Sequence, residues 1–425
     1  MSLIVVLAFF NPSLPLKEHN FEYNAADVAW MLSSTALVLI MTPGLAFFYG
    51  GMVKKKNVIS TMLQSFVCMA VVAVLWVVFG FSLVFGDSVG GIIGSPKSFF
   101  MFNGVMDHAP WAGAPTIPFV LFAMYQLKFA IITPALITGA FAERIRFTSY
   151  ILFICLFFVF IYTPLAHATW HPDGILFKMG VLDFAGGTVV HMSAGLTALA
   201  SAIYLKQGKQ FKTHEPARVT YVLLGTGLLW FGWFGFNAGS AFGANALAAT
   251  AMATTTAASG AAAVMYILFE AARGKKPSAM GTCIGVVVGL VAITPAAGFV
   301  TIPHAIVIGA VAAVACCLLI EWRTKSNIDD TLDVFPSHGV GGMIGMLLTG
   351  VFAHAAINPA VESNGLYYGE YSLFLAHLLG LIGASIFILL MAFLLLKITD
   401  WITPLRVDEA EEELGLDLSQ HGEKL

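Results

Sequence analysis

Two histidines lie in otherwise apolar stretches, and their imidazoles are the groups in this sequence best suited to move a proton. His191 follows Asp183 by eight residues, and His338 follows Asp333 by five. An imidazole both donates and accepts hydrogen bonds and changes charge near neutral pH. One such histidine alone is as often a packed side chain bonded to a backbone carbonyl as a functional group. Two in similar contexts favour a pair that shares a hydrogen bond and lines a narrow pore.

A second group of residues has the chemistry to bind a small cation. Tyr125 and Phe129 are four residues apart and share one face of a helix. Trp170 ends one apolar segment, while Phe236 and Ser240 end another. Aromatic faces attract cations, and a hydroxyl oxygen can replace one hydrating water. The alternative interpretation is an aromatic belt at a membrane surface.

The composition requires membrane-spanning helices to position these residues. Hydrophobic residues make up 58% of the 425 residues and charged residues 11%, with a mean hydropathy of +0.85 and a net charge of −3. Soluble domains have about 25% charged residues. The sequence therefore predicts an all-α polytopic membrane protein in a lipid bilayer, and it excludes a disordered chain, a secreted disulfide scaffold and a nucleic-acid binder.

A spanning helix needs about 20 largely apolar residues. Eleven segments qualify, at 27–48, 58–85, 117–142, 148–170, 184–205, 218–240, 247–272, 280–300, 302–321, 337–354 and 372–398. The Asp…His stretches begin the fifth and tenth segments. This placement predicts a five-plus-five inverted repeat followed by a final long helix.

The distribution of lysine and arginine predicts the orientation of the chain. Seventeen of the 21 cations lie on one side of the predicted helices, three on the other, and Lys128 lies within the third segment. Cytoplasmic loops carry the excess of positive charge. The N-terminus is therefore expected outside and the C-terminus in the cytoplasm. Residues 1–26 form an extracellular extension, with a poor signal peptide as the alternative, 27–400 the transmembrane domain, and 401–425 a cytoplasmic tail.

Six stretches of the sequence resemble the ammonium transporter family, which includes the Mep and Rhesus proteins. They are TPGLAFFYGGMVKKKNV (42–58), GAFAERIRF (139–147), DFAGGTVVHMSAG (183–195), GWFGFNAGS (232–240), DVFPSHGVGGMIG (333–345) and LRVDEAEEELGLDLSQHGE (405–423). They span nearly the whole chain in the order that the family has.

The resemblance implies a homotrimer with one pore in each subunit. It assigns an outer recruitment site to Trp170, Ser240, Phe129 and Tyr125, the last at a position where the family commonly has Phe. It assigns a paired phenylalanine gate to Phe129 and Phe236, twin pore histidines to His191 and His338, and structural support of the outer site to Asp183. The segment 405–423 is implied to pack under a neighbouring subunit and to bind a PII-type regulator.

These residues predict a transporter of ammonium in the plasma or inner membrane, with ammonium, ammonia and methylammonium as substrates. Ammonium is recruited at the aromatic and serine site, and ammonia passes the histidines, with or without a separately relayed proton. The alternative is a sensor of ammonium that uses the same fold. A sensor often carries a fused signalling domain, whereas about 25 residues follow the last segment here. We expect no enzyme activity, cofactor or metal, because no hydrolytic motif, phosphate loop or metal-ligand spacing is present, the five cysteines included.

Lys128 departs from the family, in which this position is usually small and uncharged. A lysine at the centre of a spanning helix costs at least about 2.5 kcal/mol. On a helical wheel it lies about 60° from Tyr125 and about 100° from Phe129. It is therefore expected either to face the path, where its charge would repel ammonium, or to face another helix or the subunit interface. In the second case the side-chain amine is neutral, is paired with a carboxylate, or extends outward to the membrane surface.

Overall fold

The structure is a computed structural model that describes residues 1–11, 21–208 and 215–425. Lys17, Lys209, Lys212 and part of the predicted N-terminal extension lie outside the described residues.

The described chain is built almost wholly from helices. These are α1 (Ser2–Phe10), α2 (Ala25–Met52), α3 (Val58–Leu75), α4 (Phe81–Phe85), α5 (Phe119–Phe141), α6 (Phe147–Phe157), α7 (Thr163–Trp170), α8 (Ile175–Lys178), α9 (Ser193–Leu205), α10 (Val219–Ala238), α11 (Ala246–Ala272), α12 (Ala279–Ile293), α13 (Ile302–Lys325), α14 (Gly341–Phe352), α15 (Ser372–Ile402), α16 (Glu409–Leu414) and α17 (Leu416–His421). Two short strands, β1 (Ser88–Val89) and β2 (Ile93–Gly94), pair antiparallel with Ser88 opposite Gly94.

Ten helical segments among the described residues are long and apolar enough to cross a membrane. Two of them continue through a π-helical segment, which joins α3 to α4 in one span and α6 to α7 in another. The predicted polytopic all-α architecture is confirmed. The predicted segment 280–300 corresponds to α12, which has only 15 residues. It ends at Ile293 because Pro295, two residues later, lacks the N–H that a further helical turn needs. The count of eleven spans therefore stays a prediction.

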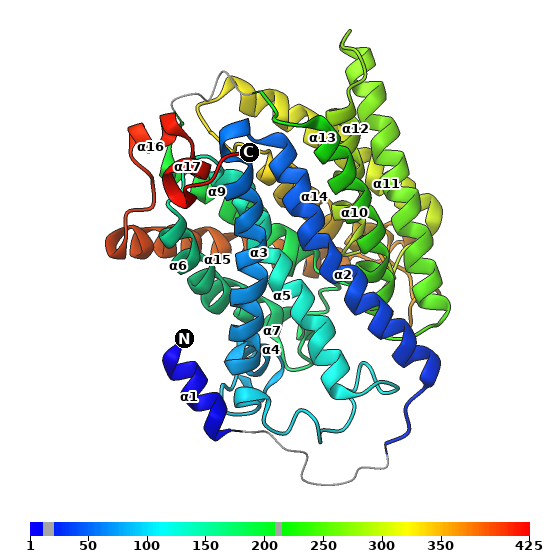
Figure 1. Ribbon diagram of the computed structural model, residues 1–425. Coiled ribbons are helices and arrows are strands. Elements are labelled where there is room, and N and C mark those ends of the chain that lie inside the picture. Colours follow the sequence, from blue (N-terminus) through cyan, green and yellow to red (C-terminus); the bar gives the residue numbers. More distant parts are fainter. Residues whose placement is uncertain (12–20, 209–214) are drawn as a thin grey trace.

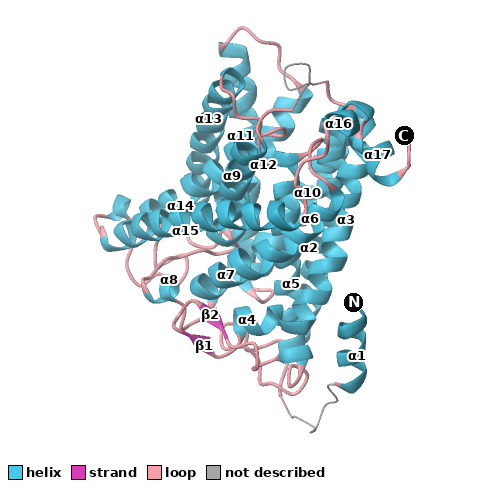
Figure 2. Ribbon diagram, turned by 90° about the vertical axis from the view of Figure 1, so that its left-hand side faces the viewer, coloured by secondary structure: helices cyan, strands magenta, loops and turns pink. Residues whose placement is uncertain are grey.

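The two ends of the bundle differ in charge. Figure 1 shows α16 and α17 beside the end of α3, and Lys54, Arg144, Arg323 and Arg406 form ion pairs in the loops and tail of that end. We call it the basic end. The hairpin β1–β2 lies at the opposite end, as Figure 2 shows.

Two π-helical segments meet in the core of the bundle and carry the two histidines. Gly187–Met192 leads into α9, and Phe335–Val340 leads into α14. Their approach depends on small residues, since a Cβ at Gly195 would lie 2.0 Å from the backbone nitrogen of Gly339. Any side chain at Gly195 would separate these helices.

Candidate functional site

A cavity of about 810 Å³ opens at the end opposite the basic end. Phe129, Trp170 and Ser240 all line it, so the structure brings three of the four residues of the expected recruitment site together. The rings of Phe129 and Trp170 meet edge to face with centroids 5.9 Å apart. The indole N–H of Trp170 donates to the backbone carbonyl of Asp183 at 3.1 Å, which orients the ring. We call this space the Trp170 cavity.

Tyr125, the fourth expected residue, lies behind the cavity wall. It is fully buried and is not among the residues that line the cavity. Its hydroxyl lies 2.9 Å from the carbonyl oxygens of both Gly235 and Phe236, and 3.2 Å from the hydroxyl of Ser240. Ser240 itself donates to the Phe236 carbonyl at 2.9 Å. Tyr125 therefore holds the Ser240 turn in place and has no direct access to a ligand.

Two phenylalanine rings close the inner end of the Trp170 cavity. The centroids of Phe129 and Phe236 are 4.4 Å apart, and both residues are buried. Phe236 also lies 6.0 Å from the ring of His191. A ligand that passes from the cavity to the histidine must displace these rings, as expected for a gate.

The two histidines form a direct pair in the core. The Nδ1 atoms of His191 and His338 are 3.2 Å apart, and the ring planes are 27° apart with centroids at 5.3 Å. The ring of Trp233 lies 20° from parallel to that of His191, with centroids 5.4 Å apart. The exposed fractions are 1% for His191 and 4% for His338. His338, whose depth the sequence leaves open, is thus as deeply placed as His191.

The Nδ1–Nδ1 contact requires the two neutral rings to be in different tautomers. One ring must donate its Nδ1–H and the other must accept, so one Nε2 carries a proton and the other carries a lone pair. The Nε2 of His191 is buried and has no hydrogen-bond partner among the described residues. A void of about 10 Å³ beside the pair is lined by apolar side chains such as Leu136, Leu229 and Val287. The path past the histidines is therefore narrow and dry, which suits a neutral molecule better than a cation.

Each histidine segment begins with an aspartate eight residues before the histidine. Asp183 accepts N–H bonds from Gly186 and Gly187 on Oδ1 and from Thr188 and Val189 on Oδ2, at 2.6 to 3.4 Å. It caps the segment that carries His191.

The matching residue in the second half is Asp330, and the sequence-based pairing of Asp333 with His338 was wrong. Asp330 accepts the backbone N–H of Phe335 at 2.7 Å and so caps the second π-helical segment. Burial raises the pKa of both Asp183 and Asp330, and the backbone donors oppose that rise. Asp333 instead adopts φ +56° and forms an ion pair with Arg323. The shared spacing of eight residues would have identified Asp330.

Comparisons with known proteins agree with this arrangement. The profile of the Ammonium Transporter Family matches residues 29–425. The chain belongs to the ammonium transporter family. A putative ammonium transporter of Methanothermobacter thermautotrophicus is 46% identical over 402 residues, which are 94% of this chain and 98% of that protein.

Solved structures of family members share the fold. The crystal structure of Saccharomyces cerevisiae Mep2 superimposes with a TM-score of 0.86 at 34% identity, over 92% of this chain and 89% of that one. A structure described as a sensor Amt protein superimposes with a TM-score of 0.84 at 28% identity, over 93% and 98%. This family member is therefore a multi-pass membrane protein.

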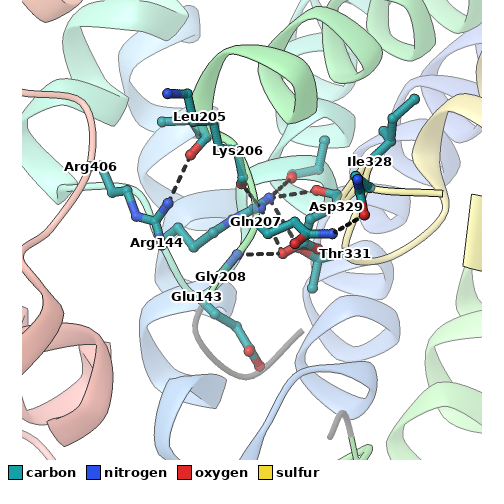
Figure 3. Close-up of polar contacts among 12 residues, drawn as sticks. Glu143, Arg144, Leu205, Lys206, Gln207, Gly208, Ile328, Asp329, Thr331 and Arg406 are labelled. Atoms are coloured by element: carbon teal, nitrogen blue, oxygen red, sulfur yellow. Dashed lines mark hydrogen bonds and ion pairs between the residues drawn. The ribbon is translucent and has the colours of Figure 1, made fainter. Parts of the chain in front are cut away.

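A second cavity, of about 310 Å³, opens at the basic end of this ammonium transporter family member. Arg144 lines this cavity, and its side chain is only 1% exposed. The Nη1 atom of Arg144 pairs with Asp329 at 2.8 Å and donates to the Lys206 carbonyl at 2.7 Å (Figure 3). Asp329 also accepts the N–H of Gly208 at 2.9 Å. One arginine thus ties three connecting loops around the mouth of the cavity.

The C-terminal segment joins the same cavity wall. Arg406 donates to the Leu205 carbonyl at 2.9 Å and pairs with Glu412 at 2.8 Å (Figure 3 shows Arg406 and Leu205). Farther along, the Asp417 carboxylate accepts the N–H groups of Ile59 and Ser60 at the start of α3. The segment 405–423 therefore packs against its own chain, and its expected contact with a neighbouring subunit stays a prediction.

Lys128 lies on the side of α5 away from the path. It lines neither the Trp170 cavity nor the void beside the histidines. Val120 and Met124 precede it at helical spacing, and both are partly exposed, which marks the outer stripe of α5. Lys128 itself is 8% exposed. The expectation that it faces the path and repels ammonium is therefore not favoured, and whether its amine is neutral, paired or extended outward stays a prediction.

Groups suited to bind a metal ion were not expected, and three or more clustered His, Cys, Asp or Glu ligands do not occur among the described residues. Sequence reasoning missed two residues, a cap of a histidine segment and a residue that lines the Trp170 cavity. Asp330 precedes His338 by eight residues, as Asp183 precedes His191, and this spacing could have identified it. Gln126, one position after Tyr125, lines the Trp170 cavity. Nothing in the sequence separates Gln126 from the other polar residues of α5.

Proposed function

We propose that this protein transports ammonium across the plasma or inner membrane, with the Trp170 cavity facing outside and the basic end facing the cytoplasm. The observation that carries the proposal is the uninterrupted order of an aromatic cavity with a serine, a phenylalanine pair and a histidine pair. The excess of cations at one end supports the orientation.

Recruitment begins with ammonium in the Trp170 cavity. The faces of Trp170 and Phe129 attract the cation, each by about 0.5–2 kcal/mol, and the Ser240 oxygen accepts one N–H. Tyr125 holds the Ser240 turn, and Asp183 holds the start of the His191 segment. The two rings and the Ser240 oxygen replace part of the water that surrounds ammonium. Without this replacement, the entry of the cation would cost many kcal/mol.

Deprotonation takes place as the substrate passes Phe129 and Phe236. One N–H bond of ammonium breaks, and the proton passes to the Nε2 atom of His191 when that atom carries its lone pair. The Nδ1 proton of His191 then moves to His338, and ammonia follows along the apolar wall. If the proton returns outward instead, transport is neutral. Currents recorded from reconstituted protein distinguish the two.

Three further properties belong to the proposal. Methylammonium is a second substrate, because it has the same charge and three N–H donors. The working unit is a homotrimer, and a PII-type protein binds at the basic end through the segment 405–423. The fold and the dry path past the histidines support the transport itself, independently of these three.

The second candidate function is an ammonium sensor, which the similarity to a sensor Amt protein favours. Uptake of radiolabelled methylammonium into cells that lack their own ammonium transporters separates the two functions. A transporter restores uptake that ammonium competes away. A sensor binds ammonium with no uptake above that of empty cells, and this outcome would overturn the transport proposal.

A further inference from the structure

One polar side chain of the Trp170 cavity has no role so far. Gln126 lies on α5 with Phe122 four residues before it and Phe129 three residues after it, and all three line the cavity. The glutamine is only 6% exposed. Its Oε1 atom is buried and has no hydrogen-bond partner among the described residues.

The charged groups that line the cavity are engaged or remote from its buried part. Both carboxylate oxygens of Asp183 accept backbone N–H groups. Lys178 is paired with Asp173 at 2.7 Å, and Glu362 is exposed to solvent. A cation in the buried part of this cavity therefore meets aromatic faces and neutral oxygen atoms, beside a single buried carboxylate whose oxygens already accept backbone N–H groups.

Ser240 supplies only one of the oxygens that ammonium needs. Its hydroxyl hydrogen is directed at the Phe236 carbonyl, so the lone pairs on its oxygen remain for a ligand. Ammonium has four N–H donors and loses a hydrogen bond for each donor left unpartnered. An unpartnered buried amide oxygen likewise carries a desolvation cost, which an N–H donor removes.

We propose that Gln126 is a specificity-determining ligand of the transport site, whose amide oxygen accepts an N–H of ammonium in the Trp170 cavity together with Ser240. The inference rests on the proposed transport function and adds a residue to it. Rotation about the terminal torsion of the side chain, which is broad for glutamine, turns the oxygen toward the cavity.

The Gln126 amide is uncharged, and this affects the deprotonation of ammonium that follows binding. A carboxylate at this position would stabilise the ammonium charge and oppose its deprotonation at the phenylalanine pair. An amide oxygen recruits the cation and leaves its proton free to depart. Gln126 therefore acts on the concentration at which transport saturates rather than on its maximum rate.

The test measures uptake of radiolabelled methylammonium, and its competition by ammonium, in liposomes that hold the purified protein, because this readout does not require transport to carry charge. We expect Gln126→Leu to raise the half-saturating concentration about tenfold, as the loss of one hydrogen bond to a charged group does, and to keep the maximum rate within about twofold. Gln126→Glu keeps an oxygen acceptor and adds a charge, so we expect its half-saturating concentration not to rise and its maximum rate to fall. If Gln126→Leu does not assemble, Gln126→Ala is measured in its place, and we expect the same rise in the half-saturating concentration.

Gln64 is the matched control. It is a glutamine on α3, 1% exposed, with an equally unpartnered Oε1, and it lines none of the three spaces described above. We expect assembled Gln64→Leu to keep its half-saturation. An equal rise in both leucine variants would overturn the inference, because it would show a general effect of losing a buried glutamine.

Variants of the proposed recruitment site distinguish a failure of the role of Gln126 from a failure of the recruitment site itself. If Trp170→Leu and Ser240→Ala raise the half-saturation and assembled Gln126→Leu does not, the glutamine is no ligand and the recruitment site stands. If none of the three changes it, the recruitment site in the Trp170 cavity is wrong, and the role of Gln126 is wrong with it.

Discussion

The segments that carry His191 and His338 have the same plan and different surroundings. Each has an aspartate eight residues before the histidine, and the histidine lies within a π-helical segment. Asp183 satisfies four backbone donors, whereas Asp330 has one carboxylate oxygen that is buried without a partner among the described residues. The repeat thus sets the position of the histidines, while neighbouring loops set how firmly each segment is held.

The charges beside the two segments differ as well. The first segment faces the Trp170 cavity, where neutral and aromatic groups predominate. The second follows Asp333, whose ion pair with Arg323 lies beside the cavity of the basic end. Burial raises the pKa of Asp333 to about 7 despite that ion pair. Carboxylates therefore lie on both sides of the histidine pair, and on the side of the basic end they lie where ammonia can regain a proton.

Substitution of the two capping aspartates should give the largest effect. Asp183→Ala leaves four buried N–H groups without an acceptor, each at a cost of about 1–3 kcal/mol. We expect it to abolish methylammonium uptake and to lower the thermal unfolding midpoint more than Asp330→Ala does. Asp183→Asn, which keeps one oxygen acceptor, should lie between Asp183→Ala and the unmodified protein. Normal uptake by well-assembled Asp183→Ala would contradict the comparison.

Removal of either histidine should rank next. We expect His191→Ala and His338→Ala to assemble and to reduce selective methylammonium uptake at least tenfold, because the relay needs both imidazoles. His191→Ala should have the larger effect, since the His191 ring also contacts the rings of Trp233 and Phe236. Uptake and potassium flux are measured on the same liposomes. Wild-type uptake with potassium still excluded in both variants would rule out the relay.

Truncation tests whether the basic end depends on the C-terminal segment. A chain that ends after Lys397 loses Arg406, Glu412 and Asp417, and with them the bonds to the Leu205 carbonyl and to the start of α3. We expect uptake to fall several-fold and binding of a PII-type protein to be lost, as measured by transport and pull-down. Unchanged values for both would show that the segment has neither role.

Lys128→Met should have the smallest effect. Lys128 lies outside both the Trp170 cavity and the histidine void, and a lysine in a span costs at least about 2.5 kcal/mol. We expect uptake to be preserved or up to about twofold higher, with an equal or higher thermal midpoint in detergent. A clear loss of uptake in correctly assembled protein would assign the lysine a part in transport.

The membrane class, nearly all of the spans and the residue types of the candidate site could be predicted from the amino-acid sequence. These follow from composition and from short stretches such as 183–195, because hydropathy and local motifs depend on neighbours along the chain. The sequence also placed Trp170, Phe129, Phe236 and the two histidines in one path through the family resemblance.

Only the tertiary structure decided which of these side chains meet. It placed Tyr125 behind Ser240 rather than in the cavity, gave Asp330 rather than Asp333 the capping role, and turned Lys128 away from the path. It also brought Gln126 to the cavity. The physical reason is that a side chain's exposure and hydrogen-bond partners depend on how helices distant in sequence rotate and pack, which the close approach of Gly195 and Gly339 sets here.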